Sequence, residues 1–156
     1  MPNHCHNRVT IYGSGNDTDE TRSQIAKLKQ IFEDESTFGQ IIPEPDWPNT
    51  PLTDSSVGNW LTDKRGDVGE LPVNGRFQST DRSDDRWYDW RLANWDTKWD
   101  AYDVHIVDDD PDQLEVEFNT AWSPPEAICN ELREQYPDLS VSWFYDEPGC
   151  EIAGYL

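Results

Sequence analysis

The stretch YDVHIVDDDPDQLEVEFNTAW, residues 102–122, decides the fold. Apolar or aromatic side chains recur at every second position on both sides of the turn Asp108–Asp112. Such alternation predicts two strands that each turn one face toward a core, and the short turn predicts that they pair antiparallel. The inward set is Tyr102, Val104 and Ile106 on the first strand and Leu114, Val116, Phe118, Thr120 and Trp122 on the second. We therefore expect a hairpin with one buried face and one charged face.

The N-terminal segment predicts strand, turn and helix in that order. Residues 7–12 alternate, with Val9 and Ile11 on the apolar side; extended backwards, the period puts Cys5 on that side and His4 and His6 on the other. Asp17 and Glu20 have the spacing of a capping box. A helical apolar stripe then runs to about residue 33, through Ile25, Leu28, Ile31 and Phe32. Residues 38–42 predict a short strand that ends at the prolines from 43 onward.

Residues 43–83 show no periodicity and are rich in Pro, Gly, Asp, Asn, Ser and Thr, which is typical of irregular connections. A helix capped by Ser83 or Asp84 follows, with Trp87 and Trp90 on one side. It leads into the densest cluster of indole rings in the chain, at residues 90–100. We interpret residues from about 43 to 100 as a long Trp-rich insertion.

After the hairpin, the chain predicts a second helix and two more strands. Ser123, Pro124 and Glu126 suit an N-cap, a first helical position and a capping-box partner. The helix side chains Ile128, Leu132 and Tyr136 share one face, and residues 139–145 alternate as a strand. Pro148-Gly149 suits a type II turn before a last strand from Cys150. The whole, residues 1–156, predicts one α+β domain: a ferredoxin-like sandwich with an antiparallel sheet, two helices on one face and the insertion.

The charge of the chain is its strongest global feature. It carries 32 acidic against 12 basic side chains, a net charge of −20, and residues 99–156 hold 15 acids against one base, Arg133. Such a field repels phosphates within a Debye length of about 10 Å, which disfavours nucleic acid as a partner. Two explanations remain open: adaptation to a salty cytoplasm, or imitation of DNA by carboxylates.

Location and redox state follow from what the sequence lacks. No run of about 18 apolar residues predicts a membrane span, and the first residues do not have the pattern of a secretory signal. Three cysteines without CxxC spacing do not predict a disulfide framework. We expect a cytoplasmic protein without membrane contact.

Several strings resemble one family. They are Met1-Pro2-Asn3-x-Cys5-x-Asn7, Ile41-Ile42-Pro43-x-Pro45, Trp90-Arg91-x-x-Asn94-Trp95-x-Thr97-Lys98-Trp99-Asp100, Phe118-x-Thr120-Ala121-Trp122-Ser123-Pro124-Pro125, and Glu147-Pro148-Gly149 with Gly154. Together they are similar to the YubB-type ferredoxin-like family of phages, plasmids and bacteria. His4 stands where that family usually has a tryptophan. The resemblance implies the fold and association with mobile elements, and carries no activity, cofactor or catalytic residue to transfer.

The candidate binding site is the Trp-rich stretch with the end of the second hairpin strand. Its members are Trp90, Arg91, Asn94, Trp95, Thr97, Lys98, Trp99, Thr120 and Trp122. Flat apolar walls with a few polar groups are typical of ligand pockets, and Arg91 or Lys98 could lie over an indole face. The same residues could instead form a second core that fastens the insertion to the sheet.

Other site chemistries have weaker support. Indole rings with Arg and Lys could stack single-stranded bases, but the charge opposes it. His4 and His6 could chelate a metal, although Cys5 should point the other way, and residues 108–112 lack the spacing of an EF-hand. No hydrolase triad order, HExxH, phosphate-binding loop or dinucleotide turn is present. His105, between acids on its strand, is an isolated titratable group.

These observations predict a non-enzymatic binding or interaction module of mobile-element type, without cofactor or metal, whose partner is an unknown small molecule or protein. One alternative is an acidic DNA mimic that inhibits a DNA-binding protein. Another is an enzyme with an unrecognised site around Arg91, Asn94 and Lys98.

Overall fold

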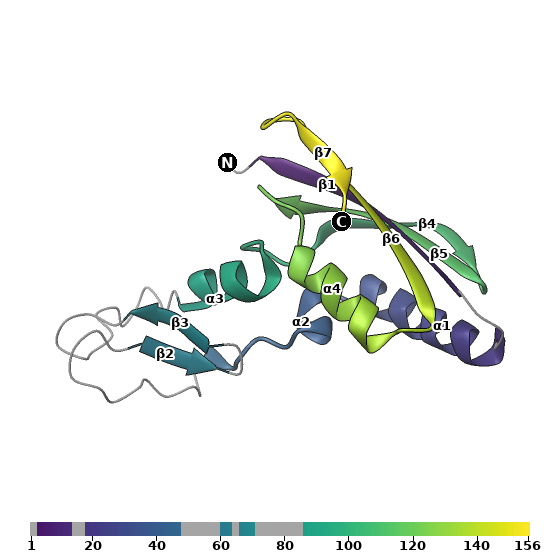
Figure 1. The fold of residues 1–156 in the computed structure, drawn as a ribbon, viewed down its shortest axis with the longest axis horizontal. Helices are drawn as coiled ribbons and strands as arrows, with labels where there is room; N and C mark the ends of the chain where they lie inside the picture. Colours follow the sequence, from purple (N-terminus) through teal and green to yellow (C-terminus); the bar gives the residue numbers. More distant parts are fainter. Residues whose placement is uncertain (1–2, 14–17, 48–59, 64–65, 71–85) are drawn as a thin grey trace. The chain divides into compact units, whose positions relative to one another are not determined.

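The computed structural model describes residues 3–13, 18–47, 60–63, 66–70 and 86–156 (Figure 1). The chain divides into two compact units: Met1–Ile42 with Trp95–Leu156, and Pro43–Asn94. We call them the core unit and the insertion unit and describe each by itself.

The core unit contains a five-stranded antiparallel sheet with strand order β4-β5-β1-β6-β7. The strands are β1 (His4–Gly13), β4 (Tyr102–Asp110), β5 (Gln113–Ala121), β6 (Leu139–Glu147) and β7 (Ile152–Tyr155). The first four, with one helix after β1 and one after β5, have the connections and neighbours of a ferredoxin-like fold, and β7 extends the sheet beyond β6. The predicted ferredoxin-like α+β class is confirmed.

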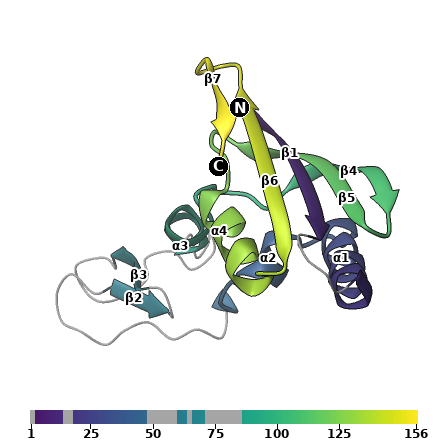
Figure 2. The same cartoon turned by 45° about the vertical axis from the view of Figure 1, so that its right-hand side comes forward.

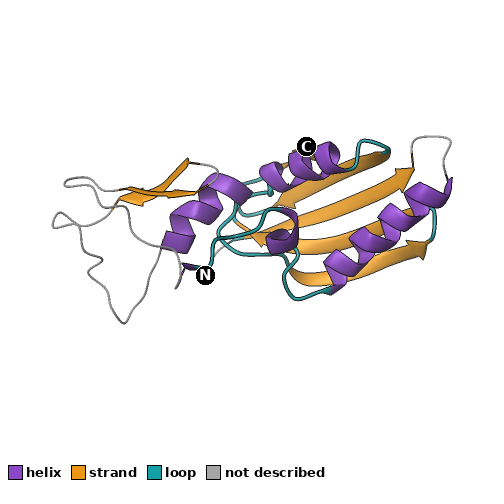
Figure 3. Cartoon of the chain, turned by 90° about the horizontal axis from the view of Figure 1, so that it is seen from below, coloured by secondary structure: helices purple, strands orange, loops and turns teal. Residues whose placement is uncertain are grey.

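Helices α1 (Thr18–Glu33), α2 (Phe38–Ile41) and α4 (Glu126–Gln135) belong to the core unit. They lie on one face of the sheet (Figure 3). The alternation in the strands sets this arrangement: Cys5, Val9 and Ile11 of β1 are fully buried, while His4 and His6 are exposed. The predicted stripe of α1 is buried as well, at Ile25, Leu28, Ile31 and Phe32.

Aromatic rings fill the centre of this core. Phe118 of β5 contacts Phe32, Phe38 and Trp143 with ring centroids 5.7, 5.9 and 5.5 Å away. The Phe118 ring lies edge to face with the rings of Phe38 and Trp143. Each such pair stabilises the fold by about 0.5–1.5 kcal/mol beyond the burial of the rings. The fully buried Trp143 side chain donates its indole N–H to Asn7 Oδ1 at 2.9 Å.

The predicted strand at 38–42 is wrong, because residues 38–41 form the one-turn helix α2. The helix depends on a group far along the chain: the Asp100 carboxylate accepts hydrogen bonds from the backbone N–H groups of Phe38 (2.8 Å) and Gly39 (3.3 Å). Those N–H groups have no partner within a helix, so a carboxylate there stabilises its start.

Two turns also differ from their predictions. β4 extends to Asp110, so the turn between β4 and β5 is only Pro111-Asp112, and Asp112 N–H donates to Asp110 Oδ1 at 2.8 Å. After β6, the residue with a left-handed backbone is Glu151 (φ 55°), not Gly149, so the turn is not the predicted type II turn.

The predicted start of α4 is wrong as well. The helix begins at Glu126 after Pro125, which makes no side-chain capping bond, and Ser123 lies outside it. Its predicted end is confirmed: Ile128, Leu132 and Tyr136 are buried, and the helix stops before Pro137.

The insertion unit contains a two-stranded antiparallel ribbon, β2 (Trp60–Asp63) with β3 (Gly66–Glu70), and residues 86–94 of α3 (Arg86–Trp95). The ribbon lies in a stretch that the sequence predicts to be irregular throughout. The predicted capping residues Asp17, Ser83 and Asp84 lie outside the described residues.

Within the described part of the chain, no helix is both long and apolar enough to cross a membrane.

Candidate functional site

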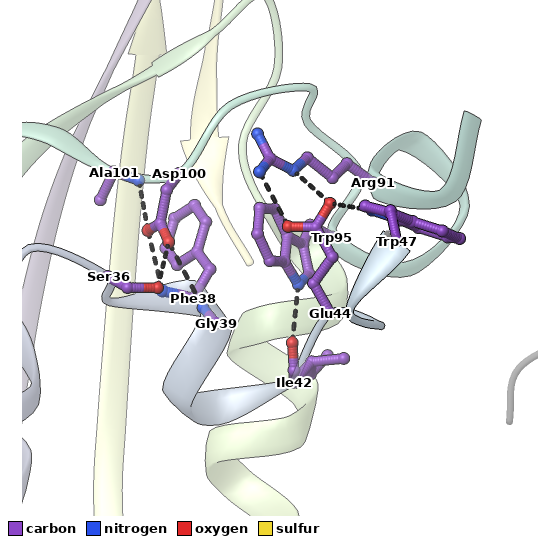
Figure 4. Close-up of polar contacts among 10 residues, drawn as sticks. All are labelled: Ser36, Phe38, Gly39, Ile42, Glu44, Trp47, Arg91, Trp95, Asp100 and Ala101. Atoms are coloured by element: carbon purple, nitrogen blue, oxygen red, sulfur yellow. Dashed lines mark hydrogen bonds and ion pairs between the residues drawn. The ribbon is translucent and has the colours of Figure 1, made fainter. Parts of the chain in front are cut away.

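The Trp-rich stretch stabilises the core unit, where Trp95 is its most buried ring. Its side chain is 1% exposed, lies edge to face with Phe38 at 5.8 Å and donates its indole N–H to the Ile42 carbonyl at 3.1 Å. It thereby ties the last residue of α3 to the end of α2 (Figure 4).

Asp100, at the other end of this loop, holds the start of α2 (Figure 4). Besides the N–H groups of Phe38 and Gly39, its carboxylate accepts the Ser36 hydroxyl at 3.2 Å and the Ala101 N–H at 2.7 Å. The Asp100 carboxylate thus accepts four hydrogen bonds from the protein itself, so its role is to stabilise the fold.

The Asp96 carboxylate caps the start of α4, as the Asp100 carboxylate caps the start of α2. Its Oδ2 atom accepts the Ala127 N–H, in the first turn of α4, at 2.8 Å. Its backbone carbonyl accepts the Ser123 hydroxyl at 2.5 Å, and the Thr97 hydroxyl donates to the Ala121 carbonyl at 3.0 Å. The cap that the sequence assigns to Ser123 therefore comes from a residue outside the local sequence.

Arg91 and Asn94 are also held by their neighbours, within the insertion unit. The Arg91 guanidinium donates to both carboxylate oxygens of Glu44, at 3.0 and 2.8 Å, and Glu44 also accepts the Trp47 indole N–H at 2.9 Å (Figure 4). The guanidinium carbon lies 5.0 Å from the ring centre of Trp87. The Asn94 amide donates to the Trp90 carbonyl one helical turn earlier, at 2.8 Å.

The nine predicted site residues therefore separate by exposure. Trp90, Asn94, Trp95, Thr97 and Thr120 are buried, with at most 1% of their surface exposed. Trp99 and Trp122 are 38% and 47% exposed, and the Lys98 ammonium lies 4.6 Å from the ring centre of Trp99. Trp122 does not continue the apolar face of β5, because its left-handed backbone (φ 70°) ends the strand and turns the ring outward.

A hollow of about 520 Å³ lies on the face of the sheet opposite the three core-unit helices. We call this face the open face. The hollow is lined from β1, β4, β5 and β6 by His6, Asn7, Arg8, Asp103, His105, Glu117, Phe118, Asn119, Phe144 and Asp146. The register explains their meeting, because His6 lies between Asn119 of β5 and Asp146 of β6, and Arg8 between Glu117 and Phe144.

Three side chains of the hollow form a hydrogen-bonded relay. The Asn119 amide nitrogen donates to Asp103 Oδ2 at 3.2 Å, and its Oδ1 atom lies 2.6 Å from His6 Nδ1. Asp103 lies where the pairing of β4 with β5 shifts register and has a left-handed backbone (φ 52°), a conformation that among non-glycine residues favours asparagine and aspartate. This irregularity directs the carboxylate toward Asn119.

The cation of the hollow is already neutralised. The Arg8 guanidinium donates to Glu117 through Nε at 2.8 Å and through a terminal nitrogen at 2.5 Å, and Nε is also 3.6 Å from Glu115. The Glu117 hydrogen bond is the main reason that the pKa of Arg8 is raised. The carboxylates of Asp103 and Asp146 remain as the excess charge of the hollow, and the structure gives Asp146 no side-chain partner among the described residues.

A row of aromatic rings adjoins the hollow in the core unit. Trp99 and Tyr102 are edge to face at 6.2 Å, Tyr102 and His4 at 5.7 Å, and the Tyr102 hydroxyl is 2.5 Å from His4 Nδ1. Burial, reinforced by the Asp103 charge, raises the pKa of Tyr102. The row connects Trp99, from the predicted site, to the strand that carries His6. The prediction that Tyr102 faces inward is therefore wrong, because Tyr102 pairs with Asn119 and the register shift falls between Tyr102 and His105.

Sequence reasoning placed His4 and His6 on the polar side of their strand but left Asp103, Asn119 and Asp146 out of the candidate site. Aligning the polar faces of the neighbouring strands could have indicated that these side chains meet. Among the described residues, no group of three His, Cys, Asp or Glu side chains is arranged to hold a metal ion. Cys5 points to the core, where burial raises its thiol pKa to about 11.

A family model with a ferredoxin-like description matches the C-terminal part of the chain. Residues 94–156 match the family model described as the ferredoxin-like domain in Api92-like protein. The matched segment holds β4 to β7 and α4. A solved structure, the crystal structure of a protein api92 from Yersinia pseudotuberculosis, is similar over 99% of this chain and 93% of that chain, with 13% identity and a TM-score of 0.48. No curated protein matches the chain.

Proposed function

We propose that the protein is a non-enzymatic interaction module that binds a positively charged segment of a partner protein on the open face of its sheet. The observation that carries this proposal is the hollow, which combines a concave surface with uncompensated carboxylates. Asp103 and Asp146 supply negative charge there, while the guanidinium of Arg8 is bound to Glu117.

The charge of the whole molecule supports the same class of partner. A net charge of −20 attracts a basic segment from solution and repels nucleic acids and acidic proteins. Complementary charge speeds association and excludes partners of the wrong sign. Lysine- or arginine-rich segments fit both the local and the global charge.

The exposed members of the predicted Trp-rich site extend this surface. The exposed rings are Trp99, which lies edge to face with Tyr102 and has the Lys98 ammonium 4.6 Å from its ring centre, and Trp122, which follows β5. Aromatic side chains are enriched at protein interfaces because they bury a large area with few rotatable bonds. The tryptophan-lined site of the proposal thus consists of exposed rings, whereas Trp90 and Trp95 support the framework.

The DNA-mimic alternative is a special case of this proposal, because DNA-binding proteins carry cationic surfaces. The enzyme alternative has less support, because Arg91 is engaged with Glu44, and Asn94 donates to the backbone of its own helix.

A fluorescence-anisotropy titration with a labelled arginine-rich peptide tests the proposal. The peptide should bind the protein, and a glutamate-rich peptide of equal length should not. Asp146→Asn should weaken binding about three- to tenfold, since a charge contact at a partly solvated interface contributes about 1 kcal/mol. Glu134→Gln, which removes one charge from the exposed side of α4, is the matched control and should leave affinity within about twofold.

Equal weakening by both variants would show that only net charge matters and would contradict a site in the hollow. Failure to bind any basic peptide at about 0.05 M salt would contradict the proposal as a whole. Competition by a DNA-binding protein, but not by other basic proteins, would single out DNA mimicry.

A further inference from the structure

The hollow contains an imidazole whose tautomer is fixed by its neighbours. The Asn119 amide nitrogen donates to Asp103, which leaves Asn119 Oδ1 directed at His6 Nδ1, 2.6 Å away. A carbonyl oxygen can only accept, so His6 Nδ1 carries a proton and donates it. In the neutral ring the lone pair must then reside on Nε2.

Several charged or titratable groups surround this imidazole. They are His4 and Arg8 on its own strand, Glu117 on β5, Asp103 and His105 on β4, and Asp146 on β6. Arg8 is neutralised by Glu117, and Asp103 is bound to Asn119. On the β6 side the strand neighbour of His6 is Asp146, so the His6 imidazole and the Asp146 carboxylate line the same hollow.

We infer that His6 Nε2 accepts a hydrogen bond from the cationic side chain of the bound segment, so that the partner binds only while His6 is neutral. This inference rests on the proposed function and adds a specificity residue and a proton dependence to it. Protonation of His6 removes the acceptor lone pair and puts a second positive charge against the ligand. Both effects weaken binding.

The sign of the pH dependence follows directly. Lysine and arginine stay protonated below about pH 10, and carboxylates stay ionised above about pH 5. Between these limits imidazoles are the side chains that change charge. Affinity should therefore fall as the pH is lowered from about 8 to 5.5, and a single excluded proton gives a limit of about tenfold per pH unit.

The test is a series of peptide titrations between pH 8 and 5.5 with wild-type protein and three variants. His6→Gln keeps an amide acceptor that does not titrate, so it should bind within about threefold of wild type at pH 8 and lose most of the pH dependence. His105→Gln removes the other imidazole that lines the hollow, for which no hydrogen bond to the relay is found among the described residues; whatever its effect on affinity at pH 8, it should keep the fall with pH.

Asn119→Asp provides a readout that a merely structural role would not move. A carboxylate against Nδ1 favours the protonated imidazole, so the pH of half-maximal binding should shift upward. The outcomes separate the two proposals. If the wild type binds the peptide at pH 8 and His6→Gln has the same pH profile, the His6 inference is overturned while the binding function stands. If the wild type binds no basic peptide at any pH, both are overturned.

Discussion

Asp96 combines two properties that are rarely found in one non-glycine residue. It has a left-handed backbone, φ 63°, and its carboxylate caps the first turn of α4 through Ala127 N–H. Asparagine and aspartate tolerate this backbone region because their short side chains bond locally. Both the left-handed backbone and the capping hydrogen bond therefore favour aspartate or asparagine at residue 96.

Asp96→Ala should destabilise the protein by about 1.5–3 kcal/mol. Loss of a helix cap costs about 0.5–2 kcal/mol, and alanine adds a cost for the left-handed backbone. Asp96→Asn keeps both an acceptor and the tolerance for that backbone, so it should cost less than about 1 kcal/mol. Urea denaturation of the two variants measures the difference, and equal midpoints would show that the cap contributes nothing.

At the scale of elements, residues 95–100, the last residue of α3 and the loop after it, bond two helices of the core unit. Trp95 bonds the end of α2, Asp100 bonds its start, and Asp96 bonds the start of α4. One short segment thus fixes where two helices begin on the sheet. The Trp-rich stretch matters to the fold for this reason, even if its buried rings never contact a ligand.

Trp95→Ala should cost about 3–5 kcal/mol, because it removes a fully buried ring and leaves a cavity beside Phe38. Trp122→Ala is the matched control, since that ring is 47% exposed, and it should change stability by less than about 0.5 kcal/mol. Trp95→Phe should fall between them, because the Ile42 carbonyl loses its indole donor. Thermal and urea unfolding both measure this order, which reverses if the exposed ring is the structural one.

Alternation and helical stripes predicted β1, the β4–β5 hairpin, α1 and β6, because those elements bury one face of a regular repeat. They could not predict α2, since Phe38-Gly39-Gln40-Ile41 has no period, and its N-terminus is satisfied by Asp100 from beyond the insertion. The sequence pattern could not predict the hydrogen-bonded relay in the hollow either. Its partners His6, Asn119 and Asp103 meet only through the pairing of three strands, and a register shift in β4 aims the carboxylate.

At the scale of the whole molecule, charge opposes folding. The chain has 20 more acidic than basic side chains, so compaction brings like charges together. Part of the acidity is used in ion pairs: Asp112 with Arg22 at 2.7 Å and Asp109 with Lys29 at 2.6 Å connect α1 to the β4–β5 hairpin. Bases are too few to neutralise the rest.

Salt should therefore stabilise this protein. The Debye length falls from about 10 Å at 0.1 M to about 3 Å at 1 M, which screens repulsion among the many unpaired carboxylates more than it weakens the few exposed ion pairs. We expect the free energy of unfolding to rise by at least about 1 kcal/mol between 0.05 and 1 M NaCl, measured from urea midpoints at pH 7. The gain should shrink near pH 4.5, where carboxylates begin to bind protons. A midpoint that falls with salt would mean that the Arg22 and Lys29 pairs outweigh the repulsion. The acidity would then serve the cohesion of the fold.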